Sequence, residues 1–374
     1  MTDTALLHHR AEGPTTAPPL LLGPSLGTSL ALWDAVAPEL STTHRVVRWD
    51  LPGHGGSPAG LIGPGATVAD LAALVLALAD ALGIDRFSYA GVSLGGAVGL
   101  HLAVHHPERV ERLAVLCSSA HFGGAQPWRE RAALVRREGT GPVAETAPTR
   151  WFTPGFTVPA LVEDNRRADP EAYAACCEAL AAYDIRDALP TITAPTLLVA
   201  GREDTATPPP HLREIADAVP GASLTELAGA AHLAPAERPG AVLAALRGHF
   251  DGEPGQGIAV RRAVLGDAHV DRAQASTDAF TARFQDFISR YAWGEIWTDP
   301  TLSRRERSVI TLTALVAHGH LDELAMHTRA ARRNGLTPEE IAAVLMQTAV
   351  YCGVPAANAA FAVARRTLDE EPPS

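Results

Sequence analysis

The alternation of strand-like and helix-like segments constrains the fold of this chain more than any other feature of its sequence. Across residues 1–250, short apolar runs alternate with segments of helical periodicity. Strands and helices that alternate in this way predict a parallel sheet covered by helices, the α/β class. The strand-like runs are residues 20–22, 45–49, 87–90, 113–117 and 196–200, and the helix-like segments are residues 68–82, 96–105, 209–218 and 239–250.

Two interruptions of this alternation predict the domain organisation. Between about residues 120 and 190 the chain has only helix-like stretches with turns, and we expect a lid inserted over the C-terminal edge of the sheet. Residues 251–258 then form a polar run rich in glycine, which predicts a linker. Residues 259–374 have helical patterns only. The sequence therefore predicts an α/β domain at residues 1–250, followed by an all-α domain.

Capping signals support helices in the second domain. Ser303 and Thr337 are each followed three residues later by a glutamate, the pattern of a capping box. Pro338 stands at the first position of the second of these helices, where a missing N–H does no harm. Asn334 and Gly335 supply a helix end just before it.

Composition and charge limit the classes of partner. The 374 residues are 47% hydrophobic and 20% charged, which is typical of a folded, soluble protein with room for two domains. A formal net charge of −11 argues against nucleic acid as a partner and leaves no basic stripe for a membrane surface. The apolar stretch at residues 71–82 is too short to span a bilayer, and no secretory signal is evident. Four cysteines without framework spacing predict reduced thiols in the cytoplasm.

Ser93 lies between Gly91 and Gly95 in a Gly-x-Ser-x-Gly pentapeptide that separates a strand-like run from a helix-like run. Such a sharp turn strains the serine backbone, and side chains in place of the two glycines would clash. The turn directs the hydroxyl out of the sheet, over the positive N-terminus of the next helix, where an oxyanion is stabilised. The pentapeptide also occurs in ordinary loops, but its position between strand and helix indicates a nucleophile.

A serine nucleophile needs a base and an orienting acid, which in this fold follow it in the order acid, then histidine. Asp204 follows the strand-like run at residues 196–200, and His232 lies in a loop of small residues before the last helix-like segment. We therefore predict a triad of Ser93, Asp204 and His232. Glu203 is the competing acid, and a surface or helix-capping role is the alternative for His232.

An oxyanion hole needs two backbone N–H groups, one from the residue after the nucleophile and one from the loop after an early strand. Leu94 follows Ser93 and supplies the first group. The loop at residues 23–28 supplies the second, and Leu26 is the predicted donor because Pro24 has no N–H to give.

Several motifs in residues 5–250 resemble the α/β-hydrolases and, within that superfamily, the 3-oxoadipate enol-lactonases. Asp50 and His54 belong to one of these motifs, and we expect them to stabilise turns near the site. Besides the serine pentapeptide, the motifs are Ser25-Leu26-Gly27-Thr28 with Trp33, Asp50-Leu51-Pro52-Gly53-His54-Gly55-Gly56-Ser57, Arg150-Trp151-Phe152-Thr153 and Ala231-His232-Leu233.

This resemblance implies the hydrolytic opening of an enol-lactone. Ser93 would attack the lactone carbonyl while His232 takes its proton, and water activated by His232 would then release the product. The carboxymethyl arm of such a substrate needs a cation. Arg131 and Arg150, with Trp151, are the candidate substrate-binding residues of the lid, and a solvated position on a helix face is the alternative for either arginine.

A second candidate site lies in the helical domain. His320, Glu323 and His327 have the spacing i, i+3, i+7, which places all three on one face of a helix. Glu323 and His327 are one turn apart and suit general acid–base chemistry. A metal site is one alternative, but the His-Glu-x-x-His spacing and a fourth ligand are missing. A purely structural buried pair is the other alternative.

Three stretches between Arg261 and Leu368 resemble the 4-carboxymuconolactone decarboxylases. Related helical domains reduce peroxides with a Cys-x-x-Cys pair. Here His320 and Glu323 stand at those positions, and the lack of two thiols excludes peroxide reduction. The resemblance implies decarboxylation without a cofactor or metal, with Glu323 or His327 delivering one proton and His320 binding the substrate. The stretches are residues 291–297, the segment from Glu323 to His327, and residues 351–361.

The two resemblances, found on different parts of the chain, name consecutive reactions of protocatechuate degradation. The sequence therefore predicts a bifunctional enzyme that converts 4-carboxymuconolactone to 3-oxoadipate enol-lactone and then to 3-oxoadipate. Its expected partners are small anionic lactones and further copies of the chain, joined through the C-terminal domain. The alternative is a serine ester or lactone hydrolase with a helical domain that serves only oligomerisation.

Overall fold

The apolar runs of residues 1–250 form a seven-stranded sheet with the order β1-β3-β2-β4-β5-β6-β7. The computed structural model describes residues 6–250, 254–278, 280–299 and 301–370. All five predicted strands are confirmed. The strands are β1 (His9–Glu12), β2 (Pro19–Gly23), β3 (Arg45–Trp49), β4 (Phe87–Val92), β5 (Val110–Leu116), β6 (Thr196–Gly201) and β7 (Ser223–Leu227).

The sheet is mixed, whereas the sequence predicts a parallel one. β1 pairs antiparallel with β3, with His9 opposite Trp49, and every other pair of neighbouring strands is parallel. The pattern of apolar runs misses β1 and β7 because both are edge strands without a fully buried face. β1 has the sequence His-Arg-Ala-Glu, and all residues of β7 are only partly buried.

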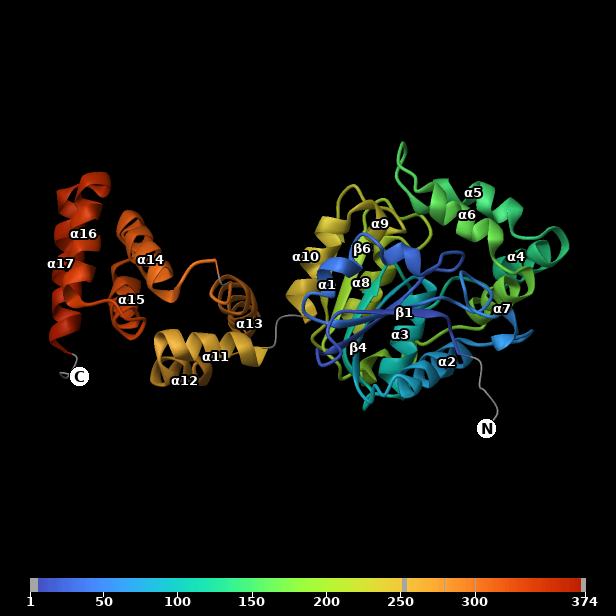
Figure 1. Ribbon diagram of the computed structural model, residues 1–374, viewed down its shortest axis with the longest axis horizontal. Helices are drawn as coiled ribbons and strands as arrows, with labels where there is room; N and C mark the ends of the chain where they lie inside the picture. Colours follow the sequence, from blue (N-terminus) through green and yellow to red (C-terminus); the bar gives the residue numbers. More distant parts are fainter. Residues whose placement is uncertain (1–5, 251–253, 279, 300, 371–374) are drawn as a thin grey trace. The chain divides into compact units, whose positions relative to one another are not determined.

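Helices cover both faces of the sheet because alternate residues of each strand point to opposite sides (Figure 1). Leu21 of β2 joins a core that includes residues of α2, α3 and α8, whereas Leu20 and Leu22 join a second core with α1 and α10. The covering elements are η1 (Leu30–Trp33), α1 (Ala37–Leu40), η2 (Ala59–Leu61), α2 (Val68–Ala81), α3 (Leu94–His105), η3 (Arg186–Thr191), α8 (Pro209–Ala218), α9 (Ala234–Glu237) and α10 (Pro239–Phe250).

The segment between β5 and β6 is helical, as the sequence predicts. Its helices are inserted at the C-terminal ends of the parallel strands, the edge of the sheet at which the loop after β4 also lies. The most extensive packing within this lid joins its first and last helices, α4 and α7. The lid helices are α4 (Ala125–Glu138), α5 (Gly141–Trp151), α6 (Pro159–Arg167) and α7 (Pro170–Ala181).

The chain divides into two units, Met1–Phe250 and Asp251–Ser374, and the described elements of the second are all helical. α11 already begins at Pro254, so a helix occupies part of residues 251–258, where the sequence predicts a linker; residues 251–253 lie outside the described residues. The helices are α11 (Pro254–Leu265), α12 (Asp267–Ala275), α13 (Ala282–Ile288), the π-helical η4 (Ser289–Ile296), α14 (Arg304–His318), α15 (Leu321–Arg333), α16 (Pro338–Cys352) and α17 (Val354–Asp369).

Both predicted capping boxes form in this unit. The hydroxyl oxygen of Ser303 accepts from the N–H of Glu306, whose carboxylate accepts from the N–H of Ser303 at 2.7 Å. Thr337 and Glu340 form the same reciprocal pair at the start of α16. These bonds satisfy N–H groups that a helix start otherwise leaves without partners. Among the described residues, no helix is long and apolar enough to cross a membrane.

Candidate active sites

Ser93 occupies a strained turn between β4 and α3. Its backbone has φ 55° and ψ −114°, a conformation that a residue with a side chain rarely adopts. The two flanking glycines are needed for close approach, because a Cβ on Gly91 would lie 2.2 Å from the carbonyl oxygen of Gly95. A Cβ on Gly95 would lie 2.6 Å from the carbonyl oxygen of Pro24. The chain therefore has the strand-turn-helix geometry of a nucleophile elbow.

Asp204 and His232 meet at the C-terminal ends of β6 and β7. The Nδ1 atom of His232 lies 2.9 Å from Oδ2 of Asp204, and both side chains are buried. Asp204 also accepts from the N–H groups of Ala206 and Thr207 and from the Thr207 hydroxyl. Burial alone would raise the pKa of Asp204, but the His232 ring and these hydrogen bonds together hold it below its ordinary value. The carboxylate is therefore ionised and fixed in orientation.

Glu203, the competing acid in the sequence, contacts a different part of this region. Its carboxylate accepts from the backbone N–H groups of Gly229 and Ala230 at 3.3 and 3.1 Å. The side chain is exposed, whereas Asp204 is 3% exposed. The structure thus brings Asp204, and not Glu203, to the histidine.

Two backbone N–H groups are available beside Ser93 for an oxyanion. Within the described ranges, the N–H groups of Leu26 and Leu94 donate to no acceptor of the protein. Gly95 donates to the carbonyl oxygen of Pro24 at 3.0 Å, which ties the elbow to the loop that carries Leu26. Both donors are therefore held by the same pair of loops, as an oxyanion hole requires.

Ser93 and His232 open into one pocket whose other walls come largely from the lid. Arg131 lies over the rings of Trp128 and Tyr173 at 5.7 and 5.8 Å. Burial, and the nearby charge of Arg131, lower the pKa of Arg150. Neither arginine forms an ion pair within the part of the chain that the structure describes. The pocket is lined by Ser25, Leu26, Ser93, Phe122, Trp128, Arg131, Arg150, Trp151, Tyr173, Leu180, Ala206, Thr207 and His232.

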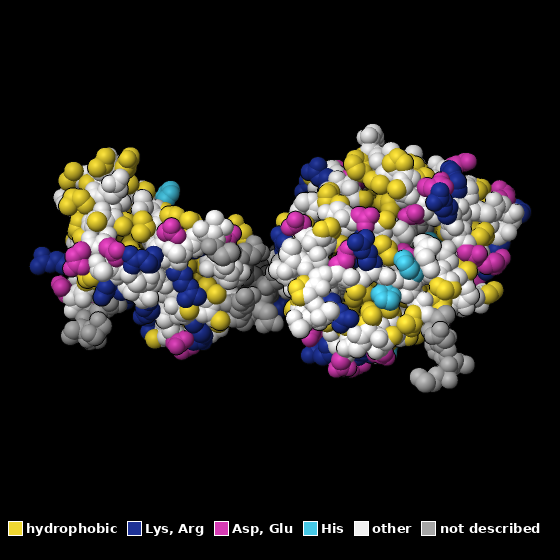
Figure 2. All heavy atoms as spheres, in the orientation of Figure 1, with side chains coloured by type: hydrophobic (Ala, Val, Ile, Leu, Met, Phe, Trp, Pro, Cys, Tyr) yellow, Lys and Arg dark blue, Asp and Glu magenta, His cyan; other side chains and the backbone are white. Residues whose placement is uncertain are grey.

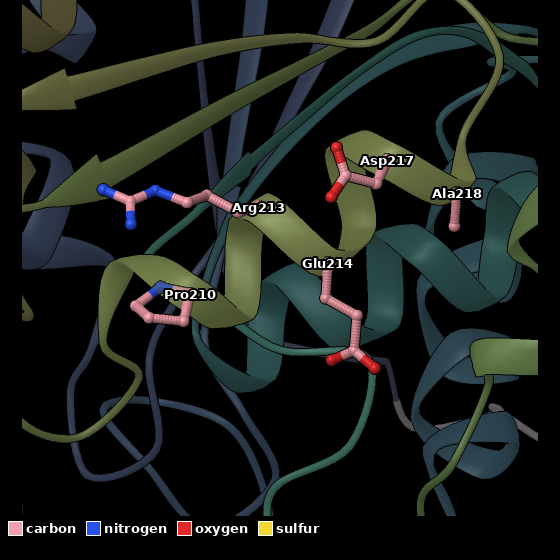
Figure 3. A pocket seen from close by; sticks show the side chains of 5 residues that line it. All are labelled: Pro210, Arg213, Glu214, Asp217 and Ala218. Carbon is pink, nitrogen blue, oxygen red and sulfur yellow. The ribbon is translucent and has the colours of Figure 1, made fainter.

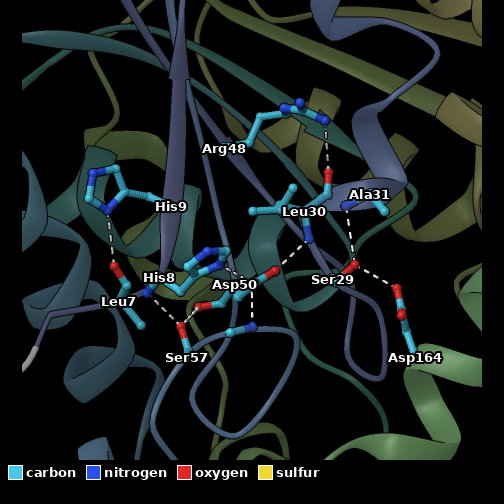
Figure 4. Close-up of polar contacts among 11 residues, drawn as sticks. Leu7, His8, His9, Ser29, Leu30, Ala31, Arg48, Asp50, Ser57 and Asp164 are labelled. Carbon is cyan, nitrogen blue, oxygen red and sulfur yellow. Dashed lines mark hydrogen bonds and ion pairs between the residues drawn. The ribbon is translucent and has the colours of Figure 1, made fainter.

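Asp50 holds the loops beside this pocket together (Figure 4). One of its carboxylate oxygens accepts from the N–H of Leu30 at 2.6 Å, and the other from the N–H of Gly56 and the ring of His8. Ser29, next to Leu30, donates its hydroxyl to Asp164 of lid helix α6 at 2.5 Å. Asp50 therefore has the turn-stabilising contacts that the sequence predicts. His54 likewise contacts its own turn, through the carbonyl oxygen of Pro52.

An open depression on α8 has no such chemistry. The side chains along it fan out in different directions and do not converge on a point (Figure 3). Arg213 is paired with Glu226 of β7. The depression lacks the convergent polar groups of a binding site. It is lined by Pro210, Arg213, Glu214, Asp217 and Ala218.

In the C-terminal unit, the three predicted residues do not share one helix face. Glu323 and His327 lie on α15, but His320 precedes the helix as its N-cap residue, with φ −81° and ψ 75°. The expected helical alignment of His320 is therefore wrong, because Gly319 ends α14 in the left-handed conformation and the chain turns there. His320 and Glu323 are exposed, whereas His327 is half-buried.

The structure adds His269 of α12 to the surroundings of His327. Burial, and then the charge of His269, lower the pKa of His327 to about 4, although Glu323 opposes this effect. His327 is therefore uncharged at neutral pH. Within the described ranges, no group of three or more His, Cys, Asp or Glu residues could hold a metal ion.

Sequence patterns missed several pocket residues. Trp128, Tyr173 and Thr207 belong to none of the sequence motifs. The lid sequence has no fixed pattern that would indicate which of its side chains face Ser93. His269 was missed for a similar reason, because packing of α12 and α15 against α11, and not sequence spacing, brings it near His327. For Tyr173, its place among the small residues of α7 was the only available hint.

The family comparisons agree with this division of the chain. The model of the alpha/beta hydrolase family matches residues 20–246, and that of the carboxymuconolactone decarboxylase family matches residues 282–366. The chain belongs to the alpha/beta hydrolase family, and its C-terminal part to the carboxymuconolactone decarboxylase family. It is a fusion of the two.

Known relatives match each part separately. The N-terminal part is 37% identical over 239 residues to 3-oxoadipate enol-lactonase 2 of Acinetobacter baylyi, covering 62% of this chain and 88% of that protein. The C-terminal part is 44% identical over 115 residues to 4-carboxymuconolactone decarboxylase of the same organism, covering 31% of this chain and 86% of that protein. The enol-lactonase structure from Burkholderia xenovorans LB400 has a TM-score of 0.62 at 36% identity, covering 64% of this chain and 94% of that one.

Proposed function

We propose that this protein is a bifunctional enzyme of protocatechuate degradation, the β-ketoadipate pathway. It decarboxylates 4-carboxymuconolactone to 3-oxoadipate enol-lactone and hydrolyses that lactone to 3-oxoadipate. One observation carries the proposal: the two parts of a single chain are similar to enzymes named for consecutive reactions, at 37% and 44% identity. The product of the C-terminal part is the substrate of the N-terminal part.

Hydrolysis uses Ser93 as the nucleophile. His232, oriented by Asp204 through Nδ1, takes the serine proton as Ser93 attacks the lactone carbonyl. The N–H groups of Leu26 and Leu94 stabilise the oxyanion. The leaving group is an enol that becomes a ketone, so it needs little acid assistance. Water activated by His232 then releases the product and regenerates Ser93.

The lid arginines bind the carboxylate of the substrate. Arg131 and Arg150 line the same pocket as Ser93, and in the described part of the chain neither forms an ion pair with an acidic side chain. A partly buried cation without a partner is stabilised by a bound carboxylate. Trp151 and the other aromatic side chains of the pocket contact the apolar part of the lactone.

Decarboxylation in the C-terminal part needs no cofactor. The departing carboxylate is bonded to the carbon γ to an unsaturated lactone carbonyl, so the electrons released with CO₂ flow into that carbonyl as a dienolate. The protein stabilises the resulting charge and delivers one proton to carbon. Glu323 and His327, one turn apart on α15, are the candidates for delivering this proton, which His327 must first accept because its ring is uncharged at neutral pH. His320, at the N-terminus of α15, contacts the substrate.

Self-association through the C-terminal unit is supported by its exposed hydrophobic side chains. In Figure 2 such side chains gather where α16 passes into α17. Val350 and Tyr351 are 76% and 79% exposed there, and an apolar cluster of this kind marks an interaction surface. Met346 of α16 and Val354 of α17 are further exposed hydrophobic side chains of these two helices.

The test separates the two activities. Ser93→Ala protein supplied with 4-carboxymuconolactone is expected to release CO₂ and accumulate enol-lactone, whereas Glu323→Gln or His327→Ala protein hydrolyses enol-lactone at near the normal rate and releases no CO₂. Both are measured by CO₂ evolution and product chromatography. Absence of CO₂ from both the wild-type and Ser93→Ala proteins would leave the alternative, a hydrolase with a helical domain that serves only oligomerisation. Preference for a simple aryl ester by orders of magnitude would overturn the lactone assignment.

A further inference from the structure

The loop that carries His232 is bound by two carboxylates. Its three N–H groups before the histidine all donate to glutamates: Gly229 and Ala230 to Glu203, and Ala231 to Glu237 at 2.8 Å. The two glutamates differ in environment. Glu203 is exposed, whereas Glu237, the last residue of α9, is 8% exposed.

The second oxygen of Glu237 binds the lid. The N–H of Thr153 donates to Oε1 at 2.9 Å, and the Thr153 hydroxyl donates to the same oxygen. A second bond runs in parallel, because Leu233 donates its N–H to the carbonyl oxygen of Trp151 at 3.1 Å. The residues on both sides of His232 are thus tied to the lid segment 151–153.

This lid segment is continuous with the wall of the active-site pocket. Arg150 and Trp151, at the end of α5, line the pocket together with Ser93 and His232. Hydrogen bonds to an ionised carboxylate are stronger than those between neutral groups, and a buried carboxylate tolerates little loss of its donors. A substrate carboxylate bound to Arg150 would therefore fix the position of a lid segment that is hydrogen-bonded to the histidine loop.

We propose that Glu237 is a positioning residue that couples occupation of Arg150 by the substrate carboxylate to the alignment of His232 with Ser93. The coupling to Arg150 rests on the hydrolase activity proposed above. The positioning of His232 does not, since it concerns any acyl group that Ser93 attacks. Misplacement of a catalytic group by about 1 Å lowers rates by as much as about 100-fold, so a positioning role of this kind is measurable.

The experiment compares Glu237→Gln with Glu203→Gln, which alters a glutamate that binds the same histidine loop but has no hydrogen bond to the lid among the described residues. The amide introduced by Glu237→Gln presents an NH₂ group to either Ala231 or Thr153, so at least one of the three hydrogen bonds to this side chain is lost. Thermal unfolding checks that both variants fold. We expect kcat for enol-lactone to fall about 10- to 100-fold in Glu237→Gln. The fold-decrease in Glu203→Gln should be at least about five times smaller than that in Glu237→Gln. Thr153→Val, which removes only the lid hydroxyl, provides a milder second variant and is expected to lower kcat about threefold.

A fluorophosphonate provides a readout that does not depend on the substrate assignment. Ser93 Oγ displaces fluoride from phosphorus and His232 accepts the serine proton, so the inactivation rate reports their alignment. We expect this rate to fall in Glu237→Gln more than in Glu203→Gln, even if enol-lactone proves not to be the substrate. Equal inactivation rates in the two folded variants would overturn the positioning role.

Coupling to the lid is tested with the Arg150→Ala background. If Glu237 transmits the effect of Arg150, the losses in enol-lactone kcat for Glu237→Gln and Arg150→Ala are less than multiplicative in the double variant. Multiplicative losses would overturn the coupling. The same cycle measured with the fluorophosphonate, which lacks a carboxylate, is expected to be multiplicative.

Discussion

Asp204 and Glu203 are adjacent acidic residues with different environments. The buried Asp204 accepts three hydrogen bonds besides its contact with His232, whereas the exposed Glu203 caps two N–H groups of a loop. A carboxylate that is buried and oriented in this way holds the histidine in one tautomer and stabilises its charged form during attack. Two carboxylates one position apart in the chain therefore differ in what they contact: one binds His232, and the other binds a loop.

Replacing Asp204 by asparagine is expected to lower kcat for lactone hydrolysis by about 10⁴-fold, because the amide favours the wrong histidine tautomer while leaving the geometry in place; the serine-protease triad provides the magnitude. Steady-state hydrolysis and a crystal structure of the variant check this result. Glu203→Gln serves as the control and should lower kcat by orders of magnitude less than Asp204→Asn. A loss of similar size in both variants would contradict the assignment.

His327 provides a prediction for the second site. Its pKa of about 4 reflects burial and the charge of His269, with Glu323 acting in the opposite direction. Replacing His269 by asparagine should raise this pKa, and Glu323→Gln should lower it further. NMR titration of the His327 ring in labelled protein measures both shifts. Shifts in the same direction for the two variants would rule out this arrangement of charges.

At the scale of elements, the elbow depends on the close approach of two loops. The β4–α3 turn and the loop after β2 contact each other through the Gly95 N–H and the Pro24 carbonyl, and no side chain fits between them. The N–H groups of Leu26 and Leu94, the proposed oxyanion donors, are positioned by the same contact. Backbone proximity, and not a particular side chain, therefore builds this half of the active site.

Gly95→Ala should disrupt this contact, because the new Cβ would lie 2.6–2.7 Å from backbone atoms of Gly23 and Pro24. We expect a loss of about 3 kcal/mol in the free energy of unfolding, a decrease of roughly 6–12 °C in unfolding temperature, and loss of lactone hydrolysis. Gly60→Ala is the matched control, since a Cβ there meets no atom within 4 Å. Calorimetry and activity assays distinguish the two, and normal activity in Gly95→Ala would refute the close-approach argument.

At the scale of the whole molecule, each unit contains a histidine whose pKa is lowered to about 4. In the N-terminal unit this is His101, through burial and the charges of His105 and His106, and in the C-terminal unit it is His327. The unfolded chain binds a proton at each near the ordinary histidine value of about 6.5. Stability from these residues is therefore fully present above about pH 6.5 and is lost as the pH falls towards 4.

Acidification from about pH 7.5 to about pH 5 should thus lower the stability of both units. We expect a loss on the order of 1 kcal/mol from each histidine, because both side chains are partly exposed and solvent screens the effect. Calorimetry at the two pH values, with His101→Asn and His327→Asn as controls, measures it. Variants that lose as much stability on acidification as the wild type would contradict this explanation.

The strands that bury a run of apolar residues were predictable from the sequence. The two strands that do not bury such a run were missed. β2 to β6 each place a run of apolar residues in the interior, whereas β1 and β7 lie at the sheet edges with mixed burial. Capping boxes were predicted correctly because they involve contacts within four residues. The alignment of His320 was wrong because the turn at Gly319 interrupts the helical spacing.

Local patterns in the sequence were enough to determine the two kinds of fold, the serine elbow and the order of its partners, because each depends on residues close together in the chain or on a strict periodicity. Tertiary structure decided the rest: that Asp204 and not Glu203 contacts His232, that Arg131 and Arg150 share a pocket with Ser93, and that Glu237 connects the lid to the histidine loop. Those contacts join distant segments, and only packing of the lid and the loops around one sheet brings them within hydrogen-bonding distance.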